Sequence, residues 1–129
     1  MRNLKKGMIP FMQRMCKHLV LQRVWHNKTQ SDVGNVVGCT FQQIQKWEKG
    51  INRITIDQVC YLYKQMGWNI ISIIRDPQEL LDFYVNRDRT STDHIDDHLV
   101  EKSDFIKRKW LKVSTPVAAT LTKQNEERI

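Results

Sequence analysis

Three short segments of the chain begin with the same helix-start signal, and this signal constrains the fold more than any other feature. In each, a threonine is followed three residues later by an acidic or amide side chain: Thr29 and Asp32, Thr40 and Gln43, Thr55 and Gln58. In such a capping box the hydroxyl accepts a hydrogen bond from the backbone N–H three residues on, and the second side chain reaches back. One box is common by chance, but three at these intervals predict three consecutive short helices.

The flanking segments extend this helical pattern. From Pro10 to about residue 26, apolar residues recur at spacings of three and four, which predicts an amphipathic helix. Gly38 leaves a short connection between the first two capped segments, which is the helix-turn-helix layout. The pair Asp76-Pro77 predicts a further helix start. Residues 69–74 are ambiguous, because Asn69 can cap a helix whereas the isoleucine-rich run favours a strand.

The remainder of the chain carries weaker signals. Residues 87–104 are polar and acidic and are interpreted as a linker, residues 105–113 as a short basic helix, and the end from Ser114 as mobile. We therefore predict a mainly all-α protein in two parts. Residues 1–75 form the helix-turn-helix domain, and residues 76–129 form a partly flexible dimerisation region or arm that adds a helix or short strand.

The basic charge is concentrated in the first of these parts. Residues 1–75 hold 12 Lys/Arg against 3 Asp/Glu, whereas residues 76–129 hold 9 against 11, and the whole chain has a net charge of +7. A dense basic domain attracts polyanions and gains free energy when counterions leave the phosphates. The charge therefore favours a nucleic-acid partner, although a basic surface that only promotes solubility would look the same.

A set of positions in the first part together resembles the phage-repressor helix-turn-helix family, also called Cro-type or XRE-like. The positions are Thr29, Gln30, Val33, Gly34, Gly38, Ile44, Glu48, Gly50 and Val59. The match covers about half the chain, and it departs from the family at Gly34, where alanine is usual. The resemblance implies five packed helices, the third of which enters the DNA major groove. It also implies a homodimer on a palindromic operator with half-sites about one helical turn apart.

The residues of the predicted third helix suit this role without the family. Ile44 and Trp47 are three apart and are expected to face the core. The opposite side carries amides, ammonium groups and no carboxylate. Glutamine can pair with adenine, lysine can donate to guanine, and an exposed phenylalanine can contact a thymine methyl group. The predicted base-reading residues are Phe41, Gln42, Gln45 and Lys46, although Phe41 can alternatively tuck back onto the domain.

The resemblance also implies contacts with the DNA phosphates. The predicted phosphate-binding residues are Arg23, Gln30, Thr40, Lys49, Asn52 and Arg53. Gln30 lies at a helix start, where backbone N–H groups favour an anion. Arg23 matches the family's basic residue that pairs with the carboxylate at Glu48, and this pair can equally be purely structural.

Other classes of site have little support. Cys16, Cys39 and Cys60 form no Cys-x-x-Cys pair and are interpreted as reduced core thiols of a cytosolic protein. His94 and His98 lack a third ligand at a suitable spacing, so we expect no metal and no cofactor. No catalytic constellation indicates an enzyme. Neither a signal peptide nor a membrane span is recognisable, which predicts a soluble, cytoplasmic protein without a membrane partner.

The sequence thus predicts a transcriptional regulator that binds specific double-stranded DNA, with a homodimeric repressor as the simplest form. Two alternatives stay open. The first is an antitoxin of a toxin–antitoxin pair that also regulates its own gene, with the segment from Arg87 as an arm for a protein partner. The second is a protein-interaction adaptor, which would show no salt-sensitive DNA binding.

Overall fold

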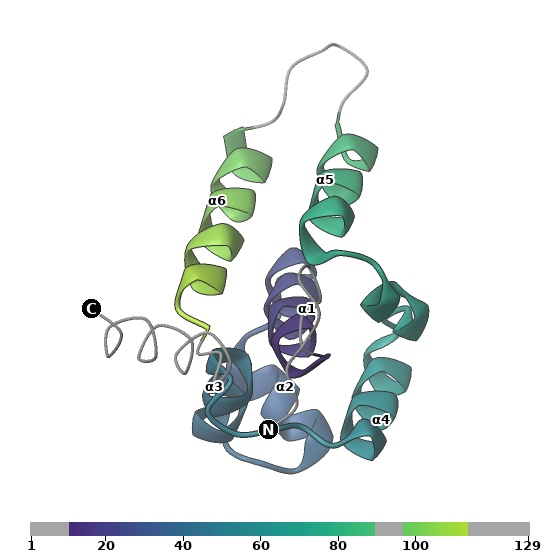
Figure 1. Cartoon of the computed structure of the whole chain (residues 1–129), viewed down its shortest axis with the longest axis vertical. Helices are drawn as coiled ribbons and strands as arrows, with labels where there is room; N and C mark the ends of the chain where they lie inside the picture. The colour runs from purple at the N-terminus through teal and green to yellow at the C-terminus, as the bar shows by residue number, and fades with distance from the viewer. Residues whose placement is uncertain (1–10, 90–96, 114–129) are drawn as a thin grey trace, which may run out of the picture.

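The computed structural model describes residues 11–89 and 97–113, which form six α-helices, one 3₁₀ helix and no strand. The elements are α1 (Phe11–Trp25), α2 (Gln30–Val37), α3 (Phe41–Lys49), α4 (Ile56–Met66), η1 (Ile70–Ile74), α5 (Pro77–Arg87) and α6 (Asp97–Leu111). Figure 1 shows α1 in the middle, with α2, α3 and α4 gathered at one end of the molecule and α5 and α6 at the other. The prediction of an all-α helix-turn-helix fold is confirmed.

The predicted capping boxes at Thr29 and Thr55 are complete. Thr29 Oγ1 accepts from the backbone N–H of Asp32 at 3.0 Å, and the Asp32 carboxylate accepts from the Thr29 N–H at 2.8 Å. Thr55 and Gln58 make the same pair of bonds at 3.1 and 3.0 Å. At Thr40 only the first half of the box is present, a bond of 3.3 Å from the backbone N–H of Gln43. The helix starts therefore follow from local hydrogen bonding.

The turn between α2 and α3 depends on two glycines. Gly38 ends α2 with a φ of 77°, in the left-handed region that a residue with a side chain rarely adopts. Gly34, inside α2, lies against the chain that enters α3, and a Cβ atom at this position would be 2.6 Å from the carbonyl oxygen of Cys39. The absence of a side chain at Gly34 thus lets α2 approach the turn closely.

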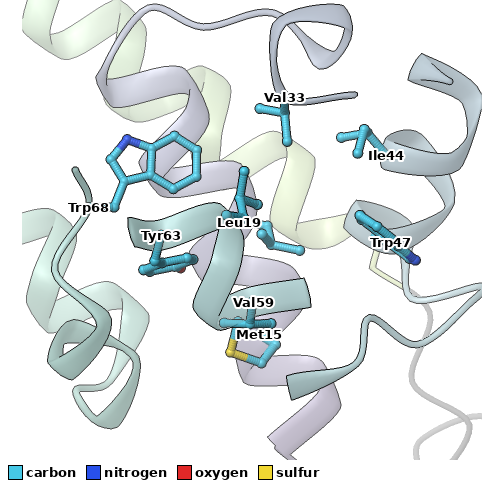
Figure 2. Close-up of a cluster of buried hydrophobic side chains, with 9 residues drawn as sticks. Met15, Leu19, Val33, Ile44, Trp47, Val59, Tyr63 and Trp68 are labelled. Atoms are coloured by element: carbon cyan, nitrogen blue, oxygen red, sulfur yellow. The ribbon is translucent and has the colours of Figure 1, made fainter. Parts of the chain in front are cut away.

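A first hydrophobic core joins the helix-turn-helix unit to α1 and α4. Its side chains converge from α1, α2, α3 and α4 and from the connection between α4 and η1, as Figure 2 shows for most of them. The buried members are Met15, Leu19, Val33, Ile44, Trp47, Val59, Leu62, Tyr63 and Trp68. Ile44 and Trp47 anchor α3 by one side, as their spacing predicted, and this anchoring determines which side of α3 faces outward.

A second hydrophobic core lies on another side of α1, where α5 and α6 pack. Its buried members are Val20, Leu21, Trp25, Leu80, Leu81, Tyr84, Leu99, Ile106 and Trp110. Helix α1 therefore contributes side chains to both cores. The predicted helix start at Asp76-Pro77 is confirmed, because the Asp76 carboxylate accepts from the backbone N–H of Gln78 at 2.8 Å and Pro77 opens α5.

Two segments differ from the sequence-based prediction. The linker predicted over residues 87–104 is wrong for its last part, because α6 begins at Asp97 and buries Leu99 and Ser103. Only one side of this helix needs to be apolar, so its polar composition resembled that of a linker. The ambiguous segment forms the 3₁₀ helix η1. Asn69 caps it, because its side-chain Oδ1 accepts a hydrogen bond from the backbone N–H of Ile71 at 3.0 Å. Residues 114–129, which were predicted to be a mobile end, lie outside the described residues. Residues 90–96, which belong to the predicted linker, also lie outside them.

The three cysteines do not share one environment. Cys16 is buried, and burial raises the pKa of its thiol to about 11. Cys39 is partly buried, whereas Cys60 is exposed. The prediction of a core thiol is therefore wrong for Cys60, because its neighbour Val59 takes the core-facing position on α4 and the next residue along a helix points elsewhere. Within the described ranges, no helix has the length and apolar character needed to cross a lipid bilayer.

Candidate nucleic-acid interface

One side of α3 is buried and the other faces outward. Ile44, Trp47 and Glu48 are buried, whereas Phe41, Gln42 and Lys46 are exposed. Phe41 retains 48% of its exposure, so it does not tuck back into the domain. Gln45 is partly buried at the edge of this surface. We call the side formed by Phe41, Gln42, Gln45 and Lys46 the outer face of α3.

The single acidic residue of α3 is kept away from this face. Glu48 is buried and forms a bidentate ion pair with Arg23, with an Nε–Oε2 distance of 2.5 Å and an Nη2–Oε1 distance of 3.0 Å. The Gln30 amide also donates to Glu48 Oε1 at 3.2 Å. This network ties α3 to α1 and to the start of α2. As a result the outer face of α3 carries no negative charge.

The structure gives two of the predicted phosphate-binding residues clear structural partners. Arg23 is only 8% exposed, and besides pairing with Glu48 it donates from Nη1 to the carbonyl oxygen of Lys28 at 3.0 Å. Gln30 is partly buried beside them. Their predicted phosphate contacts stay predictions, and so does that of Thr40, whose hydroxyl caps α3.

The remaining predicted phosphate-binding residues lie at the end of α3 and in the loop after it. Lys49 is partly buried in the last turn, whereas Asn52 and Arg53 are exposed between α3 and α4. Along the chain, all three residues follow those that form the outer face of α3. This arrangement would suit contacts with a DNA backbone next to the groove that α3 enters.

The end of α6 adds two lysines that the sequence did not assign to the site. A recess of about 150 Å³ lies between α3, the start of α2 and the end of α6. Its lining residues are Val20, Gln30, Gln45, Glu48, Lys49, Lys109 and Lys112. Figure 1 shows the last turn of α6 descending toward α3. The basic character of residues 105–113 was visible in the sequence, but nothing local indicates that they meet α3.

Within residues 11–89 and 97–113, no group of three or more His, Cys, Asp or Glu side chains is placed to hold a metal ion. His98 lies in the first turn of α6, and His94 lies outside the described residues. The structure therefore adds no ligand to the histidine pair that the sequence contains.

Two proteins of Sinorhizobium fredii (strain NBRC 101917 / NGR234) are similar to part of the chain. They are named uncharacterized HTH-type transcriptional regulators y4wC and y4aM, and each is 52% identical to it over 33 residues. The match covers 26% of this chain and 23% of each relative, so the chain spans about a quarter of the length of the curated relatives it matches. No protein-family model and no solved structure matches the chain. The names of these partial relatives support a helix-turn-helix regulator, but not the phage-repressor family in particular.

Proposed function

We propose that this chain is a transcriptional regulator that binds specific sequences of double-stranded DNA through α3. The observation that carries the proposal is the outer face of α3, which is exposed, rich in amide and ammonium groups and free of carboxylates. The names of the two partial relatives support the same class of function. A helix presented in this way by a helix-turn-helix unit can enter the major groove.

The side chains of this face have the chemistry that base reading needs. Gln42 and Lys46 are four residues apart and both exposed, so they project from the same side of α3. The glutamine amide can bond to adenine N6 and N7, and the lysine ammonium can donate to guanine O6 and N7. Phe41, at the N-terminal end of α3, can cover a thymine methyl group and so remove its own apolar surface from water.

Contacts with the phosphates would orient α3 in the groove. Lys49, Asn52 and Arg53 surround the end of the helix, and Gln30 lies at the N-terminus of α2, where backbone N–H groups attract anions. Phosphate contacts supply most of the affinity and fix the register, whereas the bases determine the sequence choice.

The regulator would act as a homodimer on a palindromic operator, with half-sites about one helical turn apart. Exposed apolar side chains on η1 and α5 support a contact between two copies, among them Ile71, Ile74 and Phe83. Occupation of an operator would then exclude RNA polymerase, which makes repression the proposed output. Such a repressor works in the compartment that holds the DNA, which in a prokaryote is the cytoplasm.

Selection of bound duplexes from a random pool tests this function directly. The proposal expects enrichment of a palindrome, with half-sites about 10 base pairs apart from centre to centre. Enrichment of a single asymmetric site would contradict the dimer. A chain that shows no salt-sensitive duplex binding would contradict DNA binding altogether and favour the adaptor alternative.

Alanine substitution of Gln42 or Lys46 tests base reading. Each variant should lose about 1–3 kcal/mol of binding free energy on the selected duplex and little on a random duplex, because a base contact is lost while the phosphate contacts remain. Fluorescence anisotropy titrations on both duplexes measure the two losses. Equal losses on the two duplexes would be inconsistent with base reading by these side chains.

Arg53→Ala provides the contrast and Lys64→Ala the control. Arg53 lies in the loop after α3, where a phosphate contact is proposed. Its loss should weaken binding to the selected and the random duplex by similar amounts, and it should reduce the slope of log K against log salt by about one. Lys64 is an exposed lysine on α4, and its removal should change neither affinity.

A further inference from the structure

The recess beside α3 gathers three ammonium groups from two helices that are far apart in the sequence. Lys49 comes from the last turn of α3, Lys109 from the last turn of α6, and Lys112 directly follows α6. The recess has a volume of about 150 Å³ and is also lined by the amides of Gln30 and Gln45. Each of these five side chains can donate a hydrogen bond, so the lining favours an anion.

Among the described residues that line this recess, Glu48 is the one carboxylate, and it does not cancel the positive charge. Glu48 is already paired with Arg23 through two bonds, and it also accepts from the Gln30 amide. The three lysines therefore line the recess without an acidic partner of their own among its described lining residues. Like charges gathered in this way are unfavourable unless an anion screens them.

The end of α6 is held where it is by contacts with α1. The indole N–H of Trp110 donates to the carbonyl oxygen of Lys17 at 2.9 Å, and the Lys102 ammonium donates to the carbonyl oxygen of Trp25 at 2.7 Å. Ile106, between these two bonds, is fully buried. Lys109 is thus carried on a docked helix, Lys112 follows directly at its end, and both line the recess beside α3.

We propose that Lys109 and Lys112 bind, together with Lys49, a phosphate of the DNA backbone next to the groove that α3 enters. The proposal rests on the proposed function, because it needs α3 in the major groove. A recognition helix in that groove has a phosphate backbone on either side of it, and the recess lies at the edge of α3 that carries Gln45 and Lys49. Helix α6 then becomes part of the DNA-binding surface, although it lies outside the helix-turn-helix unit.

A purely structural role for the two lysines makes a different prediction. Cations near the C-terminus of a helix stabilise it through the helix dipole, and the Lys109 ammonium also lies 5.6 Å from the centre of the Phe105 ring. In that case their removal would lower the thermal stability of the chain and leave its affinity for DNA unchanged.

The test is the double variant Lys109→Gln with Lys112→Gln, which keeps most of each side chain and removes both charges. On the selected duplex its affinity should fall about tenfold near 0.1 M salt, and the slope of log K against log salt should drop by about one. The loss should be of the same size on a random duplex, because phosphates carry no sequence information. Fluorescence anisotropy at several salt concentrations measures all three quantities.

The matched control removes the same charge elsewhere. Lys107→Gln with Lys64→Gln alters an exposed lysine of α4 and a lysine of α6 that lines a different recess, between α5 and α6. This control should keep the slope of the unaltered chain. A slope that falls equally in both double variants would show that only net charge matters and would overturn the proposal.

The failures of the two proposals can be told apart. If the unaltered chain selects a duplex and Gln42→Ala loses specificity, but the Lys109/Lys112 variant keeps its affinity and slope, the recess does not bind phosphate and the proposed function stands. That result would also be expected if an acidic protein segment occupied the recess. If the unaltered chain binds no duplex, both proposals are wrong.

Discussion

At the scale of single residues, Gly34 determines how closely α2 approaches the turn that precedes α3. Alanine is the better helix former by about 1 kcal/mol, so helix propensity alone would favour it at this position. In this chain a Cβ atom would lie 2.6 Å from the backbone oxygen of Cys39. A backbone carbonyl cannot move aside as a flexible side chain can, so this distance makes the glycine necessary.

Gly34→Ala should therefore destabilise the protein in spite of its better helix propensity. Overpacking of this kind costs about 1–3 kcal/mol, and after subtraction of the propensity gain of about 1 kcal/mol we expect a net loss of up to about 2 kcal/mol in the free energy of unfolding. Urea denaturation followed by circular dichroism measures it. Asn35→Ala, at the exposed next position of α2, is the control and should leave stability unchanged or slightly raised. A more stable Gly34→Ala variant would show that α2 can shift.

At the scale of elements, the sequence predicted the helix starts and stops that are determined by residues close together along the chain. The caps at Thr29 and Thr55, the stop at Gly38 and the start at Asp76 are set within four residues, and all are present. The exposed face of α3 was also predictable, because the spacing of Ile44 and Trp47 fixes which side is buried.

The same local reasoning could not find α6 or its part in the candidate site. Residues 97–104 are mostly polar, and they form a helix because Leu99 belongs to a core built largely by α1 and α5, many residues earlier. The closeness of Lys109 and Lys112 to α3 depends on the same docking. No pattern within residues 97–113 encodes the distance to a helix some sixty residues away.

Ile106→Ala tests how strongly α6 is docked. The side chain is fully buried in the second core, so its truncation should cost about 2–5 kcal/mol in the free energy of unfolding, including the cavity that it leaves. Leu111→Ala removes a similar apolar side chain from the same helix at a position that is 86% exposed, and it should change stability by less than about 0.5 kcal/mol. Chemical denaturation compares the two, and equal small effects would mean that α6 is not held by this core.

At the scale of the whole molecule, buried polar side chains of α1 form hydrogen bonds to η1, to α5 and to the connection between them. The buried Gln22 amide of α1 donates to Tyr84 Oη of α5 at 2.9 Å and to Ser72 Oγ of η1 at 3.3 Å. His18, one turn earlier, has its Nε2 atom 2.9 Å from the carbonyl oxygen of Arg75. Because buried polar groups are costly without partners, these bonds favour one relative position of α1, η1 and α5.

His18 should make this arrangement sensitive to pH. Its side chain is fully buried, and this burial lowers the pKa of the imidazole below its usual value of 6.5, with the nearby positive charge of Arg14 adding to the shift. The Arg75 carbonyl and the Asp76 carboxylate act in the opposite direction but do not outweigh burial. The neutral ring can donate from Nε2, whereas a proton on Nδ1 would have no hydrogen-bond partner among the described residues.

The direction of the effect follows from proton binding. As the pH falls below about 6.5, the unfolded chain takes up a proton at His18 before the native chain does, so the free energy of unfolding decreases until the lowered native pKa is reached. Urea denaturation between pH 7.5 and about 5.5 should show this decrease. His18→Gln is expected to be less stable at neutral pH and to lose this part of the pH dependence, so its stability should approach that of the unaltered chain as the pH falls. His26→Gln, at an exposed position near the end of α1, should keep the decrease. A gap between the unaltered chain and His18→Gln that stays constant with pH would mean that protonation of His18 does not oppose folding.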